Sequence, residues 1–82
     1  MYKNLIINYA KNMTINDITE FTKKNNITIS EEDKMTIYNH IKKYYNVFFN
    51  NPISYIKKLK GTINDETYYN ILILYDKYKD LL

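Results

Sequence analysis

The side chains of this chain that could do acid–base or nucleophilic chemistry are few and scattered. His40 is the only histidine, and cysteine is absent. None of the residues three or four positions away from it is acidic: Thr36, Ile37, Lys43 and Tyr44. Nucleophilic and general-base catalysis need a base that a third group holds in place. Because the sequence offers His40 no such group, we expect that this protein is not an enzyme.

The acidic run of Glu31, Glu32 and Asp33 is the densest group of candidate metal ligands. Neighbouring residues on a helix point about 100° apart, so three in a row do not converge on one ion. The chain also lacks the glycine-containing loop of oxygen ligands that calcium needs and the ligand set of a zinc site. A single glycine, Gly61, is too few for a glycine-rich phosphate loop. We expect neither a metal nor a cofactor, and interpret the acidic run as the charged start of a helix.

The lysines are candidate ligands for a polyanion. The net charge is +3, and all 12 residues of the Lys and Arg class are lysine. If the second and fourth predicted helices run in the same direction, the lysines near their ends share one pole and contact phosphates: Lys23, Lys24, Lys57, Lys58 and Lys60. Without arginine there is no bidentate fork for guanine or phosphate. A structural interpretation competes, because lysines in last helical turns and carboxylates in first turns complement the helix dipole.

Adjacent aromatic residues at 44–45, 48–49 and 68–69 indicate a binding surface. Because neighbours on a helix are about 100° apart, one member of each pair enters the core and the other reaches the rim. Exposed Tyr and Phe are typical interface anchors. The apolar run 71–74 sweeps about 300° of a helix, so this helix is either central in the fold or meets another chain. The candidate partner surface consists of Tyr44, Phe49, Tyr69 and Ile73. The alternative is that the tyrosine rings cover a small core and keep their hydroxyls in water.

These residues are positioned by five predicted helices and no paired strand. Apolar residues recur at helical spacing over 2–12, 14–25, 30–45, 52–60 and 65–80. The triplet 27–29 alternates like an extended segment. The predicted fold class is therefore all-α: a compact bundle of about five short helices in a single domain, 1–82, with a helix–extended-loop–helix unit near residues 14–45.

Polar residues mark where these helices begin and end. Thr14 and Ser30 are predicted N-caps, and Asp17 stands at the third helical position as in a capping box. Asn51 caps a helix that starts with Pro52. Two stops allow a left-handed backbone: the pair 25–26 and Gly61. The last helix is expected to be the longest and most apolar.

A chain of 82 residues supports one small core. It buries roughly 60–65% of the surface that its unfolded form exposes, so we expect modest stability and no deep catalytic cavity. The first ten residues carry no secretory signal pattern. The longest apolar run, 71–75, is far shorter than the ~20 residues that span a bilayer. With no cysteine, these features favour a cytoplasmic protein without a membrane role.

The order of these signals resembles that of a known family. The resemblance rests on five segments in sequence: Met13–Phe21, Lys23–Ser30 before an acidic helix start, Asn46–Phe48, Ile53–Leu59 and the restart at Thr62. Over about residues 13–80 this order is similar to that of short uncharacterised bacterial proteins of the YqfT-like family. The family has no established activity, so no functional residue is carried over. The unit at 14–45 also looks like that of SAP and LEM-type domains, some of which bind DNA and others proteins.

The function that these features favour is a small non-enzymatic protein-interaction module, which binds a protein partner or itself as a homodimer. The first alternative is a weak, nonspecific nucleic-acid binder that uses the helix-end lysines. A second is a phage-type inhibitor of a host enzyme, which fits the size and the A/T-rich codon bias but has no residue-level support. Salt separates the first two, because phosphate-led binding falls steeply with added salt while aromatic contacts lose little.

Overall fold

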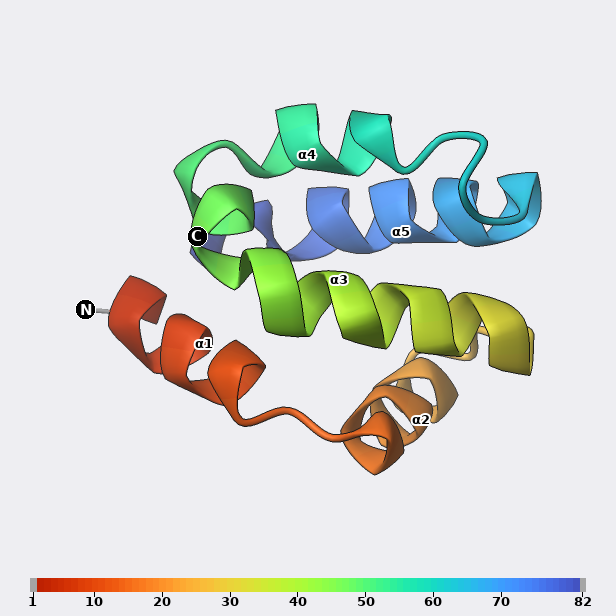
Figure 1. Ribbon diagram of the computed structural model, residues 1–82, viewed down its shortest axis with the longest axis horizontal. Helices are drawn as coiled ribbons and strands as arrows, with labels where there is room; N and C mark the ends of the chain where they lie inside the picture. Colours follow the sequence, from red (N-terminus) through yellow and green to blue (C-terminus); the bar gives the residue numbers. More distant parts are fainter. Residues whose placement is uncertain (1, 82) are drawn as a thin grey trace.

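The computed structural model describes residues 2–81, and over this range the fold is all-α, as predicted. Figure 1 shows its elements: α1 (Tyr2–Lys11), α2 (Ile15–Lys24), α3 (Glu31–Asn50), α4 (Pro52–Lys58), α5 (Asp65–Tyr78) and a final 3₁₀ turn, η1 (Lys79–Leu81). The segment 27–30 between α2 and α3 is not helical, so the predicted helix–extended-loop–helix unit is present. Apart from one backbone bridge between Lys60 and Ile63, the described residues form no β-structure.

Side-chain caps confirm the predicted helix starts. The Thr14 hydroxyl accepts the Asp17 N–H at 3.1 Å, and the Asp17 carboxylate accepts the Thr14 N–H at 2.9 Å, which completes a capping box. At the start of α3, Ser30 Oγ accepts the N–H of Asp33 at 3.1 Å. α4 begins in the same way, with Asn51 as its cap and proline in its first turn. Local hydrogen bonding therefore sets where three of the helices begin.

Two residues with positive φ follow helices. Asn26 has φ 57° after α2, and Gly61 has φ 86° in the loop between α4 and α5. A left-handed backbone costs an ordinary residue about 1–2 kcal/mol, whereas glycine adopts it freely and asparagine tolerates it. These are the two places where the sequence predicts helix stops, although α4 itself already ends at Lys58.

α3 is longer than the sequence predicts. It does not end near Tyr45 but runs to Asn50, and its 20 residues exceed the 14 of α5, so the prediction that the last helix is the longest is wrong. No glycine or proline stands between Tyr45 and Asn50 to stop it. The backbone leaves helical geometry once, at Tyr44 (φ −123°, ψ 18°), so α3 consists of two helical stretches joined at a kink. Side chains after Tyr44 therefore follow a shifted register.

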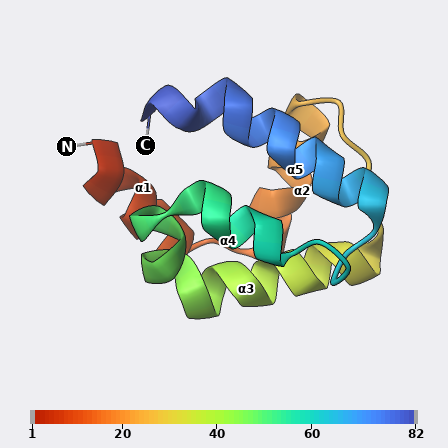
Figure 2. The same ribbon diagram turned by 90° about the horizontal axis from the view of Figure 1, so that it is seen from above.

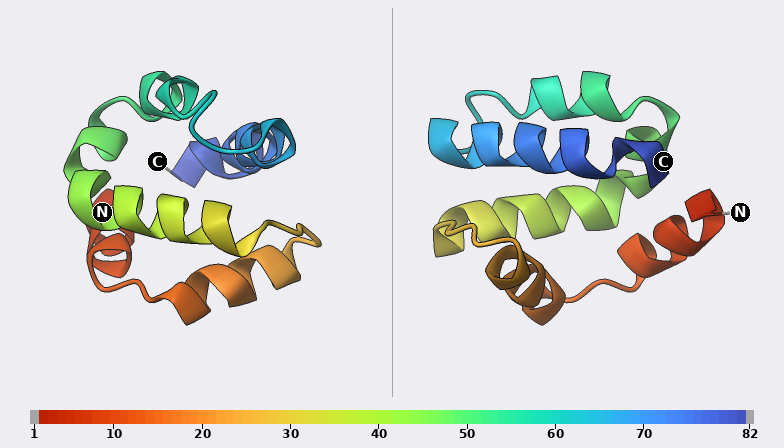
Figure 3. Two further views of the ribbon diagram at one scale, coloured as in Figure 1. Left: turned by 45° about the vertical axis from the view of Figure 1, so that its right-hand side comes forward. Right: turned by 180° about the vertical axis from the view of Figure 1, so that it is seen from behind.

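α3, and not α5, is the central helix. It packs against α1, α2 and α4, while α5 packs mainly against α4 (Figures 1 and 3). The starts of α3 and α5 are joined by hydrogen bonds that the Asp33 carboxylate accepts. In the view from above, the two helices diverge toward their C-terminal ends (Figure 2). Of the two explanations for the apolar run 71–74, a central position in the fold is therefore wrong.

The most buried side chains gather between α4, α5 and the loop that joins them. Ile56, Leu59, Ile63 and Tyr68 form one cluster, with Ile56 only 2% exposed. Partly buried side chains pack around this cluster: Phe48, Tyr55, Ile71, Leu72 and Tyr75. Burying one such side chain fully stabilises the fold by about 1.5–3 kcal/mol. The core is thus off-centre, on the α4–α5 side of the molecule.

Candidate functional site

The outer face of α5 exposes two large apolar side chains. Tyr69 is 56% and Ile73 is 64% exposed, and residues four apart share one face of a helix. Exposed carboxylates of α5 and η1 flank them: Asp65, Glu66, Asp76 and Asp80. Five of these six side chains, all but Asp80, belong to α5. Because successive residues of a helix are rotated by about 100°, these five fall within an arc of about 100° around the helix axis. We name these six residues the acidic-rimmed face.

The lysines at the end of α5 leave this face with an excess of carboxylates. Lys79 Nζ lies 2.9 Å from the Asp76 carboxylate, whose hydrogen bond raises the pKa of Lys79. Lys77 Nζ donates instead to Asn25 Oδ1 of the α2 end at 3.0 Å. The acidic-rimmed face is therefore negative on a protein whose net charge is +3.

The other two residues of the predicted partner surface lie elsewhere. Phe49 is buried, at 8% exposure, with its ring edge-on to that of Phe48 at a centroid distance of 4.9 Å. Its assignment to an exposed surface is wrong because the kink at Tyr44 shifts the register, which places Phe49 inside and leaves Phe48 half-buried. Tyr44 itself is half-buried, in contact with aromatic side chains of α3 and α4. The structure therefore brings together Tyr69 and Ile73 alone.

A second exposed apolar pair, on α1, escaped the sequence analysis. Leu5 is 63% and Tyr9 is 56% exposed, although their spacing predicts an inward face. α1 packs on α3 and turns Ala10 inward, at 7% exposure, so Leu5 points outward. Tyr9 lies at the edge of this outer face, since it is exposed and also lines the pocket among the helices. Spacing alone gave no means of choosing between the two sides of a helix this apolar.

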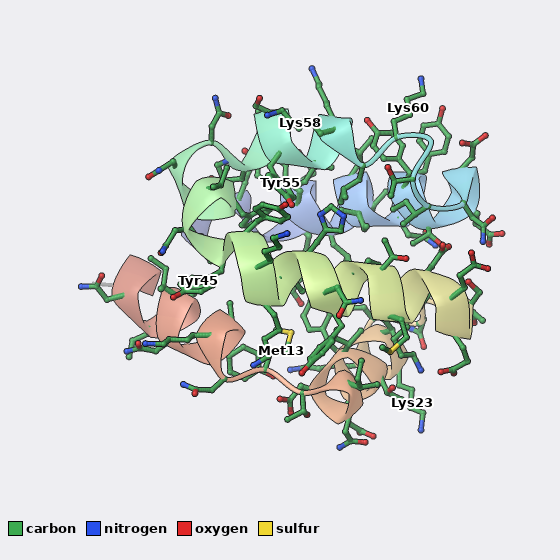
Figure 4. The ribbon with its side chains drawn as sticks, in the orientation of Figure 1. Met13, Lys23, Tyr45, Tyr55, Lys58 and Lys60 are labelled. Atoms are coloured by element: carbon green, nitrogen blue, oxygen red, sulfur yellow. The ribbon has the colours of Figure 1, made fainter. Side chains whose placement is uncertain are left out.

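The five candidate phosphate contacts fall into two separate groups. Lys23 and Lys24 end α2, Lys57 and Lys58 end α4, and Lys60 follows; all are exposed. Figure 4 shows Lys23 beyond α2 at one edge of the molecule and Lys58 and Lys60 beyond α4 at the opposite edge. α2 and α4 both pack against α3, which lies between them in this view. The predicted shared pole is therefore wrong.

His40 has a partner that the sequence did not reveal. Its Nδ1 lies 2.6 Å from the hydroxyl of Tyr55, which is 15 residues away on α4, and Figure 4 shows Tyr55 between α4 and α3. The Tyr44 ring lies 5.6 Å from His40 and 5.9 Å from Tyr55. Burial raises the pKa of Tyr55, and the neighbouring Tyr44 raises it further. This hydrogen bond ties the central helix to α4.

Asp33 joins the starts of two helices. Asn64 occupies the N-cap position of α5, but its side chain makes no capping hydrogen bond. The Asp33 carboxylate, on α3, accepts the Asn64 N–H at 3.2 Å and the Thr67 hydroxyl at 2.7 Å. Asp33 is only 5% exposed and lies near the positive dipole ends of both helices. The acidic run is therefore a helix start, as predicted, and its third member also holds α5 in place.

A pocket of about 460 Å³ lies among the five helices, all of which line it. α3 contributes Ile37 and Ile41, α1 contributes Ala10, and α5 contributes Ile71 and Leu74. From the size of the chain we expected no deep catalytic cavity. The structure nevertheless contains a pocket of this volume, and the surface of its wall is almost entirely apolar.

Polar contacts attach both ends of α5, one of the helices that line this pocket. At the N-terminal end, Asp33 binds the start of α5. At the C-terminal end, Asn25 Oδ1 accepts hydrogen bonds from Lys77 Nζ at 3.0 Å and from the Tyr78 hydroxyl at 3.2 Å, and the Phe21 and Tyr78 rings are 5.9 Å apart. Between these two attachments, the inner side of α5 packs against α4 and also lines the pocket, with Ile71 and Tyr75 doing both.

Comparison with known proteins assigns no function. No family model, curated protein or solved structure matches this chain. The resemblance to the YqfT-like family therefore stays a prediction. Within residues 2–81, no helix has the length and apolarity needed to cross a bilayer, and no three His, Asp or Glu side chains come together as a metal site.

Proposed function

We propose that this protein is a non-enzymatic interaction module that docks the acidic-rimmed face of α5 into an apolar groove bordered by basic residues on a protein partner. The observation that carries the proposal is the exposure of Tyr69 and Ile73, one helical turn apart between carboxylates. Anchors at this spacing are how a helix fills a partner's groove, and tyrosine is enriched among such anchors. The expected setting remains the cytoplasm of a bacterium.

Charge favours a foreign partner over a second copy of the chain. Carboxylates stand at both ends of α5, at 65–66 and at 76 and 80. In a two-fold dimer through this face, either direction of pairing brings carboxylates against carboxylates. Like charges about 4 Å apart repel by about 1 kcal/mol in water and by more where water is excluded. A basic rim on the partner turns the same charges into an attraction.

The same charges disfavour nucleic acid as the ligand, because carboxylates repel phosphates. The five candidate lysines lie in two groups on opposite edges of the molecule, which divides the positive charge that a backbone contact would need. We therefore do not propose nucleic acid as the ligand, and the experiment below includes a step that would detect its binding.

The experiment uses Ile73→Ser with Leu5→Ser as its matched control, since Ile73 and Leu5 are 64% and 63% exposed on different helices. Each tagged protein is incubated with a lysate of the organism that encodes it, and a retained protein is then purified and titrated. We expect that the wild type and Leu5→Ser bind it equally and that Ile73→Ser weakens binding about tenfold, the loss typical of an anchor residue. Binding should also weaken as salt screens the carboxylates.

Three outcomes would overturn the proposal. Equal binding by both variants would remove the acidic-rimmed face from the contact. Retained material that a nuclease releases would assign the lysines as the binding groups. If sedimentation equilibrium shows that the wild type is a dimer and that Ile73→Ser is a monomer, the partner is a second copy of the chain.

A further inference from the structure

The pocket among the five helices has walls without a charged group. Among the residues whose side chains the structure describes, no lysine, aspartate or glutamate lines it. Several of the polar side chains on its wall are already engaged elsewhere: the Thr22 hydroxyl donates to the Thr19 carbonyl, the Thr67 hydroxyl donates to Asp33, and His40 and Tyr55 bind each other. A charged ligand would lose its hydration here without gaining an oppositely charged partner among the described lining residues. The wall therefore favours an uncharged molecule.

The volume of the pocket selects a small molecule over a helix. Its 460 Å³ lie within the range of about 300–1,000 Å³ of ligand pockets and are about three times the ~150 Å³ cavity that holds one benzene. A helix of about 10 Å diameter and 5.4 Å pitch fills such a volume within about one turn. A partner's helix therefore does not fit, whereas a molecule of about three rings does.

The two ends of α5 keep this space available. Asp33 attaches its start to α3, and Asn25 attaches Lys77 and Tyr78 at its end to α2. The helix between these polar contacts spans the pocket, so the cavity does not depend on one flexible loop. The outer residue Ile73 and the lining residue Ile71 stand on opposite sides of this span.

We propose that the pocket binds an uncharged, largely hydrocarbon small molecule of up to about three rings in size. The site is distinct from the acidic-rimmed face, so either proposal stands or falls without the other. An apolar ligand inside would bury the inner side of α5, which the protein alone leaves facing the cavity.

The test uses N-phenyl-1-naphthylamine, an uncharged three-ring probe that fluoresces in apolar surroundings. We expect saturable binding to the folded wild type, and displacement by dodecanol but not by dodecanoate, which has the same chain length and a charged head. Ile71→Trp places a bulky indole in the pocket and should weaken probe binding at least about tenfold, while Ile73→Trp on the outside should leave it within about twofold. The chain has no other tryptophan, so the blue shift of its emission reports whether the new indole enters the pocket.

A measurement on the wild type alone keeps the proposal falsifiable if Ile71→Trp does not fold. Saturating probe should shift the backbone amide NMR signals of Ala10 and Ile71 and leave that of Leu5 unmoved. The proposal fails if the probe does not bind, if dodecanoate displaces it as well as dodecanol does, or if Ile73→Trp weakens it as much as Ile71→Trp. It also fails if the amide signals of Ala10 and Ile71 do not respond to the probe but shift when the protein is diluted. That result would mean that a second copy of the chain occupies the pocket in a dimer.

Discussion

Replacing Asp33 with alanine should destabilise the whole fold by detaching the start of α5. The carboxylate accepts the Thr67 hydroxyl at 2.7 Å and the Asn64 N–H at 3.2 Å, and Asp33 and Thr67 are 5% and 3% exposed. Alanine leaves both donors without their acceptor. Each such loss costs about 1–3 kcal/mol, so Asp33→Ala should lose about 2–6 kcal/mol. The expected total for 82 residues is about 4–12 kcal/mol, so the variant should be close to unfolding.

The assay is urea unfolding followed by circular dichroism, with Glu32→Ala as the control. Glu32 is exposed in the same first turn of α3, so its loss removes only a dipole contribution of about 0.3–1 kcal/mol. Thr67→Val completes a double-mutant cycle with Asp33→Ala, and we expect a coupling energy above about 0.5 kcal/mol between the two positions. Amide hydrogen exchange of Tyr68, whose N–H donates to the Asn64 carbonyl, should accelerate in Asp33→Ala.

The reasoning is refuted if Asp33→Ala loses no more stability than Glu32→Ala. Coupling below about 0.5 kcal/mol with Thr67→Val would refute it as well, because the buried hydroxyl would then not depend on the carboxylate. Either result would mean that α5 is held by its apolar contacts with α4 and not by a carboxylate from α3.

Three further predictions concern single residues and are checked by urea unfolding. Gly61→Ala meets no atom within 4 Å of the added Cβ, so it should lose only the backbone cost of about 1–2 kcal/mol for φ 86°; an unchanged stability would contradict this. Asn26→Gly should be neutral or stabilising, because φ 57° suits glycine better than asparagine, and a loss above about 1 kcal/mol would show a side-chain role. Tyr55→Phe should lose about 0.5–1.5 kcal/mol at neutral pH with its hydrogen bond to His40. Because burial raises the pKa of Tyr55, the folded state favours the neutral phenol, whose contribution is complete below the usual tyrosine pKa of about 10 and is lost as the pH rises through the raised value. The deficit of Tyr55→Phe should therefore shrink at high pH, and a constant deficit would contradict the burial of this hydroxyl.

The helix starts could be predicted from the sequence because each depends on residues a few positions apart. Thr14 and Asp17 complete their capping box within one turn, and Ser30 caps α3 in the same way. The start of α5 is different, since its cap comes from Asp33, 31 residues away from Asn64. Local pattern shows Asp33 as one acidic residue among three, and only the packing of α5 against the start of α3 shows which one is buried.

The candidate site could be predicted in part. Tyr69 and Ile73 follow from helical periodicity, because they stand four positions apart on one face of a helix whose other apolar residues face inward. Phe49 could not be assigned correctly, because one non-helical residue, Tyr44, rotates every side chain that follows it. The lysines were expected to gather at one pole, but the direction in which α4 leaves α3 placed them at two edges.

The sequence by itself determined the fold class, the caps of α2, α3 and α4 and the two left-handed positions, because these are fixed by backbone hydrogen bonds and sterics within a few residues. Tertiary structure decided which helix is central, which aromatic of each pair is buried, the partner of His40 and the existence of the apolar pocket. Most of those features depend on contacts between residues that are distant in the chain, such as His40 with Tyr55 and the attachments of α5 to Asp33 and Asn25, and such contacts leave no local pattern.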